Sequence, residues 1–194
     1  KYRTPVMILA DGALGQMMEK VEFKDYDTSK RQTPAWATTG KTKDRERNIV
    51  TSLFIQPERM EIQNKTLQKK YAKICENEVK YEAIETQDAD YILVAFGLSA
   101  RICHKAQQVL RKNGVKVGLL RPRTLYPYPY KIINELADKA KSFLVVEMNA
   151  GQMVEDVRLG VNGKKEVHFF GKMGGMIPSP EDVINEMNNI IKKS

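Results

Sequence analysis

The chain has 194 residues and a mass of 22.2 kDa, enough for one large domain or for one domain with an attached segment. Hydrophobic residues make up 42% of it and charged residues 29%, and these ordinary proportions exclude intrinsically disordered and fibrous classes. The net charge of +8 is spread thinly: residues 1–80 hold 16 basic and 11 acidic side chains, and residues 81–194 hold 16 and 13. Because a nucleic-acid-binding arm would concentrate its charge, and no apolar run reaches about 18 residues, we expect neither nucleic acid nor membrane as a partner.

The sequence contains two cysteines, Cys75 and Cys103. Two thiolates are too few for a four-thiolate iron–sulfur cluster or a four-cysteine zinc site within this chain. We expect both thiols to be reduced in a cytoplasmic setting. The chain opens at Lys1 with no initiator Met and no secretory leader, so we expect it to be a fragment of a longer polypeptide.

Residues 1–23 have the pattern of one strand followed by one helix. The run Val-Met-Ile-Leu-Ala at 6–10 lies between Pro5 and Asp11-Gly12, which is typical of a buried parallel strand. The apolar residues that follow are spaced as one stripe of a helix: Leu14, Met17, Met18 and Val21. A single strand and helix cannot bury both faces, so we predict that residues 1–23 are the end of a truncated domain.

Residues 24–80 are predicted to be a connector. Periodicity fails from 22 to about 56, where Trp36 is the residue most suited to pin the segment to a domain surface. A helix then begins at Pro57 and continues to residue 79, with a thin apolar stripe and a mostly polar surface.

Residues 81–194 alternate regularly between strands and helices. The predicted strands are 81–85 at an edge of the sheet, then 91–96, 115–120, 143–147 and 166–170. The predicted helices are 99–112 with Ser99 as N-cap, 129–140, 152–160 and 180–191. This alternation predicts a doubly wound, mainly parallel α/β sheet.

Three turns partly match known cofactor-binding motifs, but each lacks residues that its motif requires. The turn at 96–101 has one glycine where a dinucleotide fingerprint needs three, so a serine-capped turn is the alternative. Gly171-Lys-Met-Gly-Gly175 lacks the Gly-Lys-Ser/Thr end of a P-loop. Its paired glycines indicate either a close approach by another chain or an ordinary turn. Asp11-Gly12 lacks both the first glycine and the downstream asparagine of the magnesium–thiamine-diphosphate motif.

Two groups of residues are candidates for a substrate rim or a protein interface. In the stretch 121–129, Arg121, Arg123 and Thr124 follow a strand and precede aromatic residues and prolines, a surface suited to anions or protein contacts. The second group, after the next two strands, is Asn149, Lys172, Gly174 and Gly175. A helix N-terminus near Asn149 could take an anion. Since the ends of parallel strands share one edge, we expect 121–129 and 172–175 to be neighbours on one rim, with solvated turns as the alternative.

The sequence resembles the α subunit of the 2-oxoacid:ferredoxin oxidoreductases. The stretch 5–19 resembles the end of their pyrimidine-binding domain, and Trp36-Ala-Thr-Thr-Gly40 resembles their connector. Three further stretches resemble the transketolase C-terminal-like domain that follows: 120–129, 147–152 and 171–175. The resemblance covers essentially the whole chain in the right order, and residues 1–23 look most similar to the branched-chain, 2-oxoisovalerate type, with the 2-oxoglutarate and pyruvate types still possible.

The resemblance implies oxidative decarboxylation of a 2-oxoacid to an acyl-CoA by a complex that uses thiamine diphosphate, Mg²⁺ and iron–sulfur clusters. Its implied partners are a β subunit, other subunits, ferredoxin and CoA. No catalytic, cofactor-binding or metal-binding residue is assigned here, so no cofactor is expected on this fragment alone, and its role would be structural. A stand-alone Rossmann-like nucleotide-binding domain and a basic binding module remain as alternatives.

Overall fold

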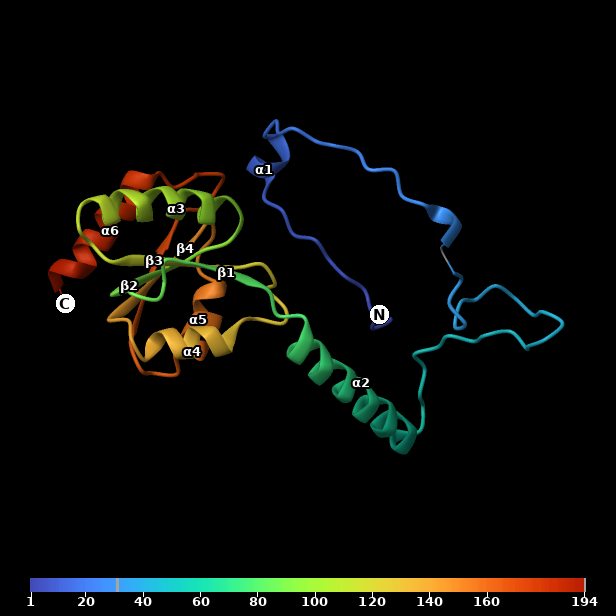
Figure 1. Cartoon of the computed structure of the whole chain (residues 1–194). Coiled ribbons are helices and arrows are strands. Elements are labelled where there is room, and N and C mark those ends of the chain that lie inside the picture. The colour runs from blue at the N-terminus through green and yellow to red at the C-terminus, as the bar shows by residue number, and fades with distance from the viewer. Residues whose placement is uncertain (31, 194) are drawn as a thin grey trace. The chain divides into compact units, whose positions relative to one another are not determined.

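The computed structural model describes residues 1–30 and 32–193, and it divides into two compact units (Figure 1). One unit combines Lys1–Met17 with Lys70–Ser194, and the other is Met18–Lys69. The first unit contains the sheet and its helices.

A five-stranded sheet forms the centre of the first unit. Its strands are β1 (Tyr81–Ile84), β2 (Tyr91–Val94), β3 (Val117–Pro122), β4 (Ser142–Glu147) and β5 (Glu166–Gly171). They lie in the order β1-β3-β2-β4-β5, with β1 antiparallel to β3 and the other pairs parallel. The prediction of a doubly wound, mainly parallel sheet with an edge strand near residue 81 is therefore confirmed.

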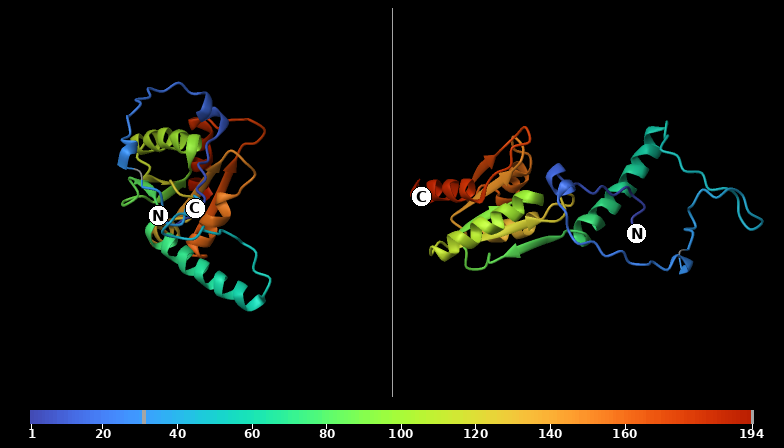
Figure 2. Two further views of the ribbon diagram at one scale, coloured as in Figure 1. Left: turned by 90° about the vertical axis from the view of Figure 1, so that its right-hand side faces the viewer. Right: turned by 90° about the horizontal axis from the view of Figure 1, so that it is seen from above.

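Helices cover both faces of the sheet. They are α3 (Gly97–Lys112), α4 (Tyr130–Ala137), α5 (Met153–Val161) and α6 (Pro180–Lys193). Helices α3 and α6 pack together on one face, and α4 and α5 pack together on the other (Figure 2). The strand order reverses between β2 and β4, because the chain passes from β2 to β3 on one side and returns to β4 on the other.

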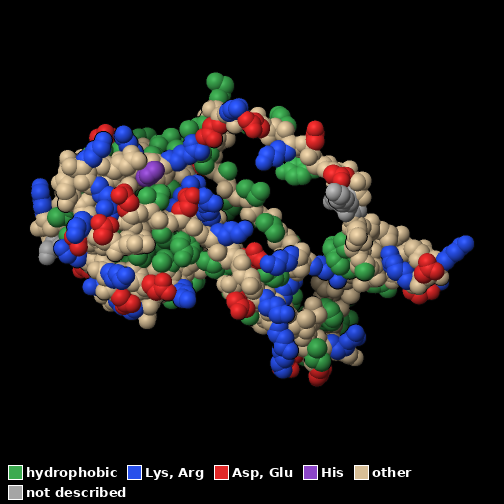
Figure 3. All heavy atoms as spheres, viewed as in Figure 1, with side chains coloured by type: hydrophobic (Ala, Val, Ile, Leu, Met, Phe, Trp, Pro, Cys, Tyr) green, Lys and Arg blue, Asp and Glu red, His purple; other side chains and the backbone are tan. Residues whose placement is uncertain are grey.

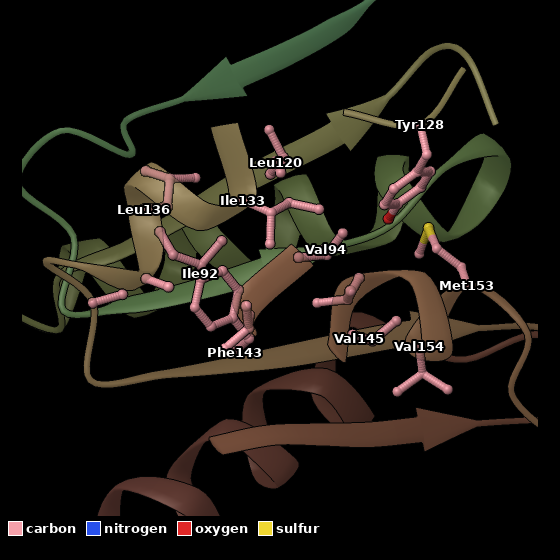
Figure 4. Packing of buried hydrophobic residues seen from close by; sticks show 14 of the residues in the cluster. Ile92, Val94, Leu120, Tyr128, Ile133, Leu136, Phe143, Val145, Met153 and Val154 are labelled. Carbon is pink, nitrogen blue, oxygen red and sulfur yellow. The ribbon is translucent and has the colours of Figure 1, made fainter. Parts of the chain in front are cut away.

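Alternation along the strands divides the core into two clusters. Ile92 and Val94 point toward α4 and α5, where Phe143 and Ile133 join them (Figure 4). Leu93, on the opposite face of β2, packs in the cluster that contains α3 and α6. Because β2 is covered on both faces, all four of its residues are buried, which explains its continuous apolar sequence.

Two predicted boundaries differ from the structure. Helix α3 begins at Gly97, so Ser99 lies inside its first turn and is not the N-cap; the residue before the helix is Phe96. Strand β3 continues to Pro122, because β1 pairs with it as far as the Tyr81–Pro122 register. Arg121 is therefore a strand residue.

The predicted strand at 6–10 is wrong in this structure. Residues 6–10 form no strand, and the exposed fractions of Val6, Met7, Ile8 and Leu9 are 87%, 79%, 92% and 65%. Helix α1 (Gly12–Gln16) is much shorter than the apolar stripe predicted. An extended run needs a neighbouring strand to become part of a sheet, and the described residues place none beside it.

The second unit is mostly irregular. It contains a short 3₁₀ turn, η1 (Thr28–Lys30), and the first part of helix α2 (Pro57–Asn77), whose predicted bounds are confirmed within two residues. The Asn48 side-chain amide donates to the carbonyl oxygens of Ala35 and Ala37 at 2.7 and 3.0 Å. Trp36 is 48% exposed. Within the described parts of the chain, no helix is long and apolar enough to cross a membrane.

Candidate functional site

A crevice of about 230 Å³ opens at the carboxyl ends of β2 and β4. It lies where the strand order reverses, the position at which open parallel sheets characteristically bind ligands. Its walls come from residues 9–11, from the β2–α3 turn and from the end of β4: Leu9, Ala10, Asp11, Phe96, Gly97, Ser99, Glu147, Met148 and Asn149.

Glu147 ends β4 and is 2% exposed. Its carboxylate accepts hydrogen bonds from the backbone N–H groups of Met153 and Val154 at 2.9 and 3.0 Å, and more distantly from that of Gln152 at 3.3 Å. These groups form the first turn of α5, whose positive end stabilises a buried negative charge. The N–H groups expected to take an external anion therefore already bind an acid of this chain.

The turn after Glu147 is held by short polar contacts. The Asn149 side-chain amide donates to Glu147 Oε2 at 3.1 Å, and Asn149 Oδ1 accepts from the Gly151 N–H at 2.7 Å. Gly171 lies against this turn, since a Cβ at that position would lie 2.4 Å from the Asn149 carbonyl oxygen. Only glycine fits there without a shift of the turn. The turn after β4 and its close contact with β5 therefore fix the floor of the crevice.

Within the first unit, Asp11 links the N-terminal segment to helix α3. Its Oδ1 accepts from the Leu14 N–H at 2.8 Å, and its Oδ2 accepts from the Leu98 N–H at 3.2 Å. It is therefore the N-cap of α1 and also supplies an acceptor to the first turn of α3. The sequence signal for the N-cap is an aspartate directly before Gly12, but nothing in the sequence points to the contact with α3.

Arg121 and Arg123 pair with the neighbouring edge strand β1, and Thr124 bonds within its own turn. Arg121 Nη1 lies 3.0 Å from Glu82 Oε2, and Arg123 pairs with the other oxygen of the same carboxylate. The Thr124 hydroxyl donates to the Pro127 carbonyl oxygen at 2.8 Å. One glutamate on β1 thus receives both guanidinium groups.

Lys172 is paired with an acid at the start of α6. Its Nζ lies 2.6 Å from Asp182 Oδ2, which also accepts from the Ser179 N–H at 2.8 Å. The hydrogen bond from Lys172, followed by those from the Ser179 backbone and hydroxyl, lowers the pKa of Asp182 to about 2. Gly174 and Gly175 have positive φ angles of 67° and 84° and lie in an exposed turn.

The two candidate groups share an edge of the sheet but are not neighbours. Residues 121–124 end β3 and residues 172–175 follow β5, and β2 and β4 lie between these strands. The expectation of adjacent segments is therefore wrong. Of the candidates, only Asn149 lines the crevice, which Asp11 and Glu147 also line.

The described residues do not form a metal or cluster site of their own. No group of three or more His, Cys, Asp or Glu side chains among them is placed to hold a metal ion. Cys75 is exposed and Cys103 is buried, and both are free thiols. The donor set therefore does not fit an iron–sulfur cluster, and the two carboxylates of the crevice are occupied by backbone N–H groups.

Charge does not separate the surface into acidic and basic faces in the view shown. Lys and Arg side chains are interspersed with Asp and Glu on the face of the sheet unit in Figure 3. This mixed pattern agrees with the even distribution of charge along the sequence.

Residues 89–183 match the family model described as pyruvate:ferredoxin oxidoreductase core domain II. The whole chain is 41% identical to ketoisovalerate oxidoreductase subunit VorB of Methanothermobacter marburgensis over 194 residues, which is 100% of this chain and 54% of that protein. The chain thus spans about half the length of the curated relatives it matches. It is homologous to subunits of 2-oxoacid:ferredoxin oxidoreductases, including the ketoisovalerate type.

Solved structures share the fold. A 2-oxoglutarate:ferredoxin oxidoreductase from Magnetococcus marinus, solved with 2-oxoglutarate, coenzyme A and succinyl-CoA bound, matches with a TM-score of 0.60 and 20% identity over 71% of this chain and 24% of that chain. A split-gene transketolase in an inactive β4 tetramer matches with a TM-score of 0.50 and 14% identity over 58% of this chain and 41% of that chain. The transketolase-like fold is therefore confirmed.

Proposed function

We propose that this chain is part of the α subunit of a thiamine-diphosphate-dependent 2-oxoacid:ferredoxin oxidoreductase. The proposed reaction converts 2-oxoisovalerate, or a related 2-oxoacid, and CoA to an acyl-CoA and CO₂, with the two electrons passed to ferredoxin. The observation that carries the proposal is the 41% identity to a ketoisovalerate oxidoreductase subunit across all 194 residues.

The proposed division of the chain follows the same resemblance. Residues 1–23 are assigned to the end of a pyrimidine-binding domain, 24–80 to a connector, and 81–194 to a transketolase C-terminal-like domain. The exposure of Val6 and Ile8, at 87% and 92%, supports the first assignment, because a run of this composition is ordinarily buried between neighbouring strands.

The cofactors are proposed to lie on other parts of the complex. Thiamine diphosphate and Mg²⁺ would be held by the β subunit and by earlier residues of the α subunit, and the clusters by cysteine-rich parts, with none on this chain alone. Two cysteines cannot supply four thiolates, and Asp11 and Glu147 already bind backbone N–H groups. Two free thiols suit a reducing, cytoplasmic setting.

Glu147 and Asn149 have a structural part in this proposal. The carboxylate orders the start of α5, and the amide fixes the turn beside it, so that the crevice keeps its shape without a bound group. Arg121, Arg123 and Lys172 are proposed to contact neighbouring subunits or an anionic substrate through the donors that Glu82 and Asp182 leave open.

Competition between substrates tests the proposal. The complete subunit is produced with its partner subunits and supplied with CoA, oxidised ferredoxin and equal amounts of 2-oxoisovalerate, 2-oxoglutarate and pyruvate, and the acyl-CoA products are identified by mass spectrometry. We expect isobutyryl-CoA to predominate. Predominance of succinyl-CoA or acetyl-CoA would reject the branched-chain assignment, and the absence of any acyl-CoA product would reject the oxidoreductase.

A further inference from the structure

We propose that Asp11 is a positioning residue, whose carboxylate holds residues 9–11 against the start of α3 and thereby fixes one wall of the crevice. The part of this inference that concerns turnover rests on the proposed function. The part that concerns the contact itself does not.

One carboxylate serves two helices that are far apart in the sequence. Asp11 Oδ1 accepts from Leu14 in α1, and Oδ2 accepts from Leu98 in α3, 87 residues away. Both N–H groups belong to first turns, where the helix itself supplies no acceptor. A negative charge between two such turns meets the positive ends of both helices.

The start of α3 is shaped for an acceptor from outside the helix. Phe96 is the N-cap residue, and its side chain has no oxygen to offer. Gly97 has a φ of +56°, and a Cβ there would lie 3.1 Å from Asp11 Oδ2. Glycine therefore permits both the turn and the close approach of the carboxylate.

Apolar packing contributes little to this wall of the crevice, so polar contacts have to position it. Leu9 is 65% exposed although it lines the crevice. A second anchor lies at the other end of the segment, where the Tyr2 hydroxyl donates to Glu78 Oε1 at 2.7 Å. Residues 3–10 extend between these two anchors, and Asp11 is the anchor next to the crevice (Figure 1).

Two substitutions separate the contact with α3 from the local cap of α1. Serine is a good N-cap, so Asp11→Ser retains an acceptor for Leu14, but its short side chain cannot reach Leu98 as well. Asp11→Ala removes both acceptors. Asp27→Asn is the matched control, since Asp27 Oδ1 accepts from the Ser29 N–H at 3.0 Å within the other unit.

The exchange rate of the Leu98 N–H in this chain measures how strongly Asp11 protects it. We expect the Leu98 N–H to exchange about tenfold faster in both Asp11 variants, whereas the Leu14 N–H is affected only in Asp11→Ala and neither changes in Asp27→Asn. Unchanged exchange of Leu98 in Asp11→Ser would overturn the proposal.

The KM and kcat of the assembled enzyme test whether this wall of the crevice positions a substrate. We expect the KM of the enzyme for its 2-oxoacid or for CoA to rise several-fold in Asp11→Ser, whereas simple loss of correctly assembled enzyme would lower only the apparent kcat. An unchanged KM for both would also overturn the proposal. If the parent enzyme oxidises no 2-oxoacid, the proposed function fails, and the exchange of Leu98 still decides whether Asp11 holds the segment.

Discussion

Two apolar runs of nearly the same composition have opposite environments in this molecule. Ile92, in the middle of β2, is fully buried between β3 and β4, and helices cover both faces of its strand. Ile8, in the run 6–10, is 92% exposed and belongs to no strand. A short apolar run therefore indicates burial against some neighbour, but it does not indicate which chain segment supplies that neighbour.

The two carboxylates that line the crevice also differ in where their hydrogen-bond donors come from. Glu147, at the end of β4, is buried and accepts hydrogen bonds from the start of α5, the next helix in the chain. In the N-terminal segment, Asp11 reaches across to a helix 87 residues away. The first arrangement can form whenever the domain folds, whereas the second requires the segment to be held in place.

Substitution of one isoleucine in each region should give the largest difference. We expect Ile92→Ala to lower the free energy of unfolding by about 2–5 kcal/mol, because it opens a cavity in a core with no solvent access. Ile8→Ala, the matched control, should change it by less than about 0.5 kcal/mol. Urea denaturation of the chain measures both, and similar losses for the two variants would mean that residues 6–10 are buried in solution.

A second substitution tests the buried acid of the crevice. Glu147→Gln keeps the shape of the side chain, but an amide has one accepting oxygen where the carboxylate has two, so we expect a loss of about 1.5–3 kcal/mol. Glu155→Gln on the same helix is the control, because its carboxylate is 70% exposed and its change should lie within about 0.5 kcal/mol. Equal stability of the two variants would show that α5 does not depend on Glu147 for its cap.

Much of the fold could be predicted because the signals are local. The five strands of the sheet and the helices between them follow from apolar spacing, and Ser179-Pro180 with two following acids predicts the start of α6. The failure at Ser99 is also local: Gly97 turns the chain early, so the serine enters the first helical turn and is buried. A serine followed by helix-forming residues gives the same sequence pattern whether it is the N-cap or lies in the first helical turn.

The candidate site could be predicted only in part, because it depends on strand order. Sequence patterns place Arg121 and Lys172 at the same edge, but they do not reveal that two strands lie between them. Asn149 is predictable because it lies two residues after the end of a predicted strand. The contact of Asp11 with α3 is not predictable, because its partner is the backbone N–H of Leu98, and any residue except proline would supply the same donor.

The smallest expected effect concerns a pair that the sequence does not predict, Lys172 with Asp182. The hydrogen bond from Lys172 is the first cause of the low pKa of Asp182, about 2 against an ordinary 3.8. A lowered folded-state pKa stabilises the fold above the ordinary value and loses that stabilisation as the pH falls from 3.8 toward 2. Lys172→Met should therefore raise the pKa of Asp182 and leave it below 3.8, because the hydrogen bonds from Ser179 to the carboxylate still lower it.

Carbon NMR of the Asp182 carboxyl group during an acid titration measures this change. Lys192→Met, in the last turn of the same helix, removes the same charge at a distance and should leave the midpoint unchanged. Since the Asp182 side chain is 34% exposed, added salt should weaken the charge contribution of Lys172 and leave the bonds from Ser179 intact. An unaltered midpoint in Lys172→Met would assign the low pKa to the helix cap alone and leave Lys172 free to bind a partner.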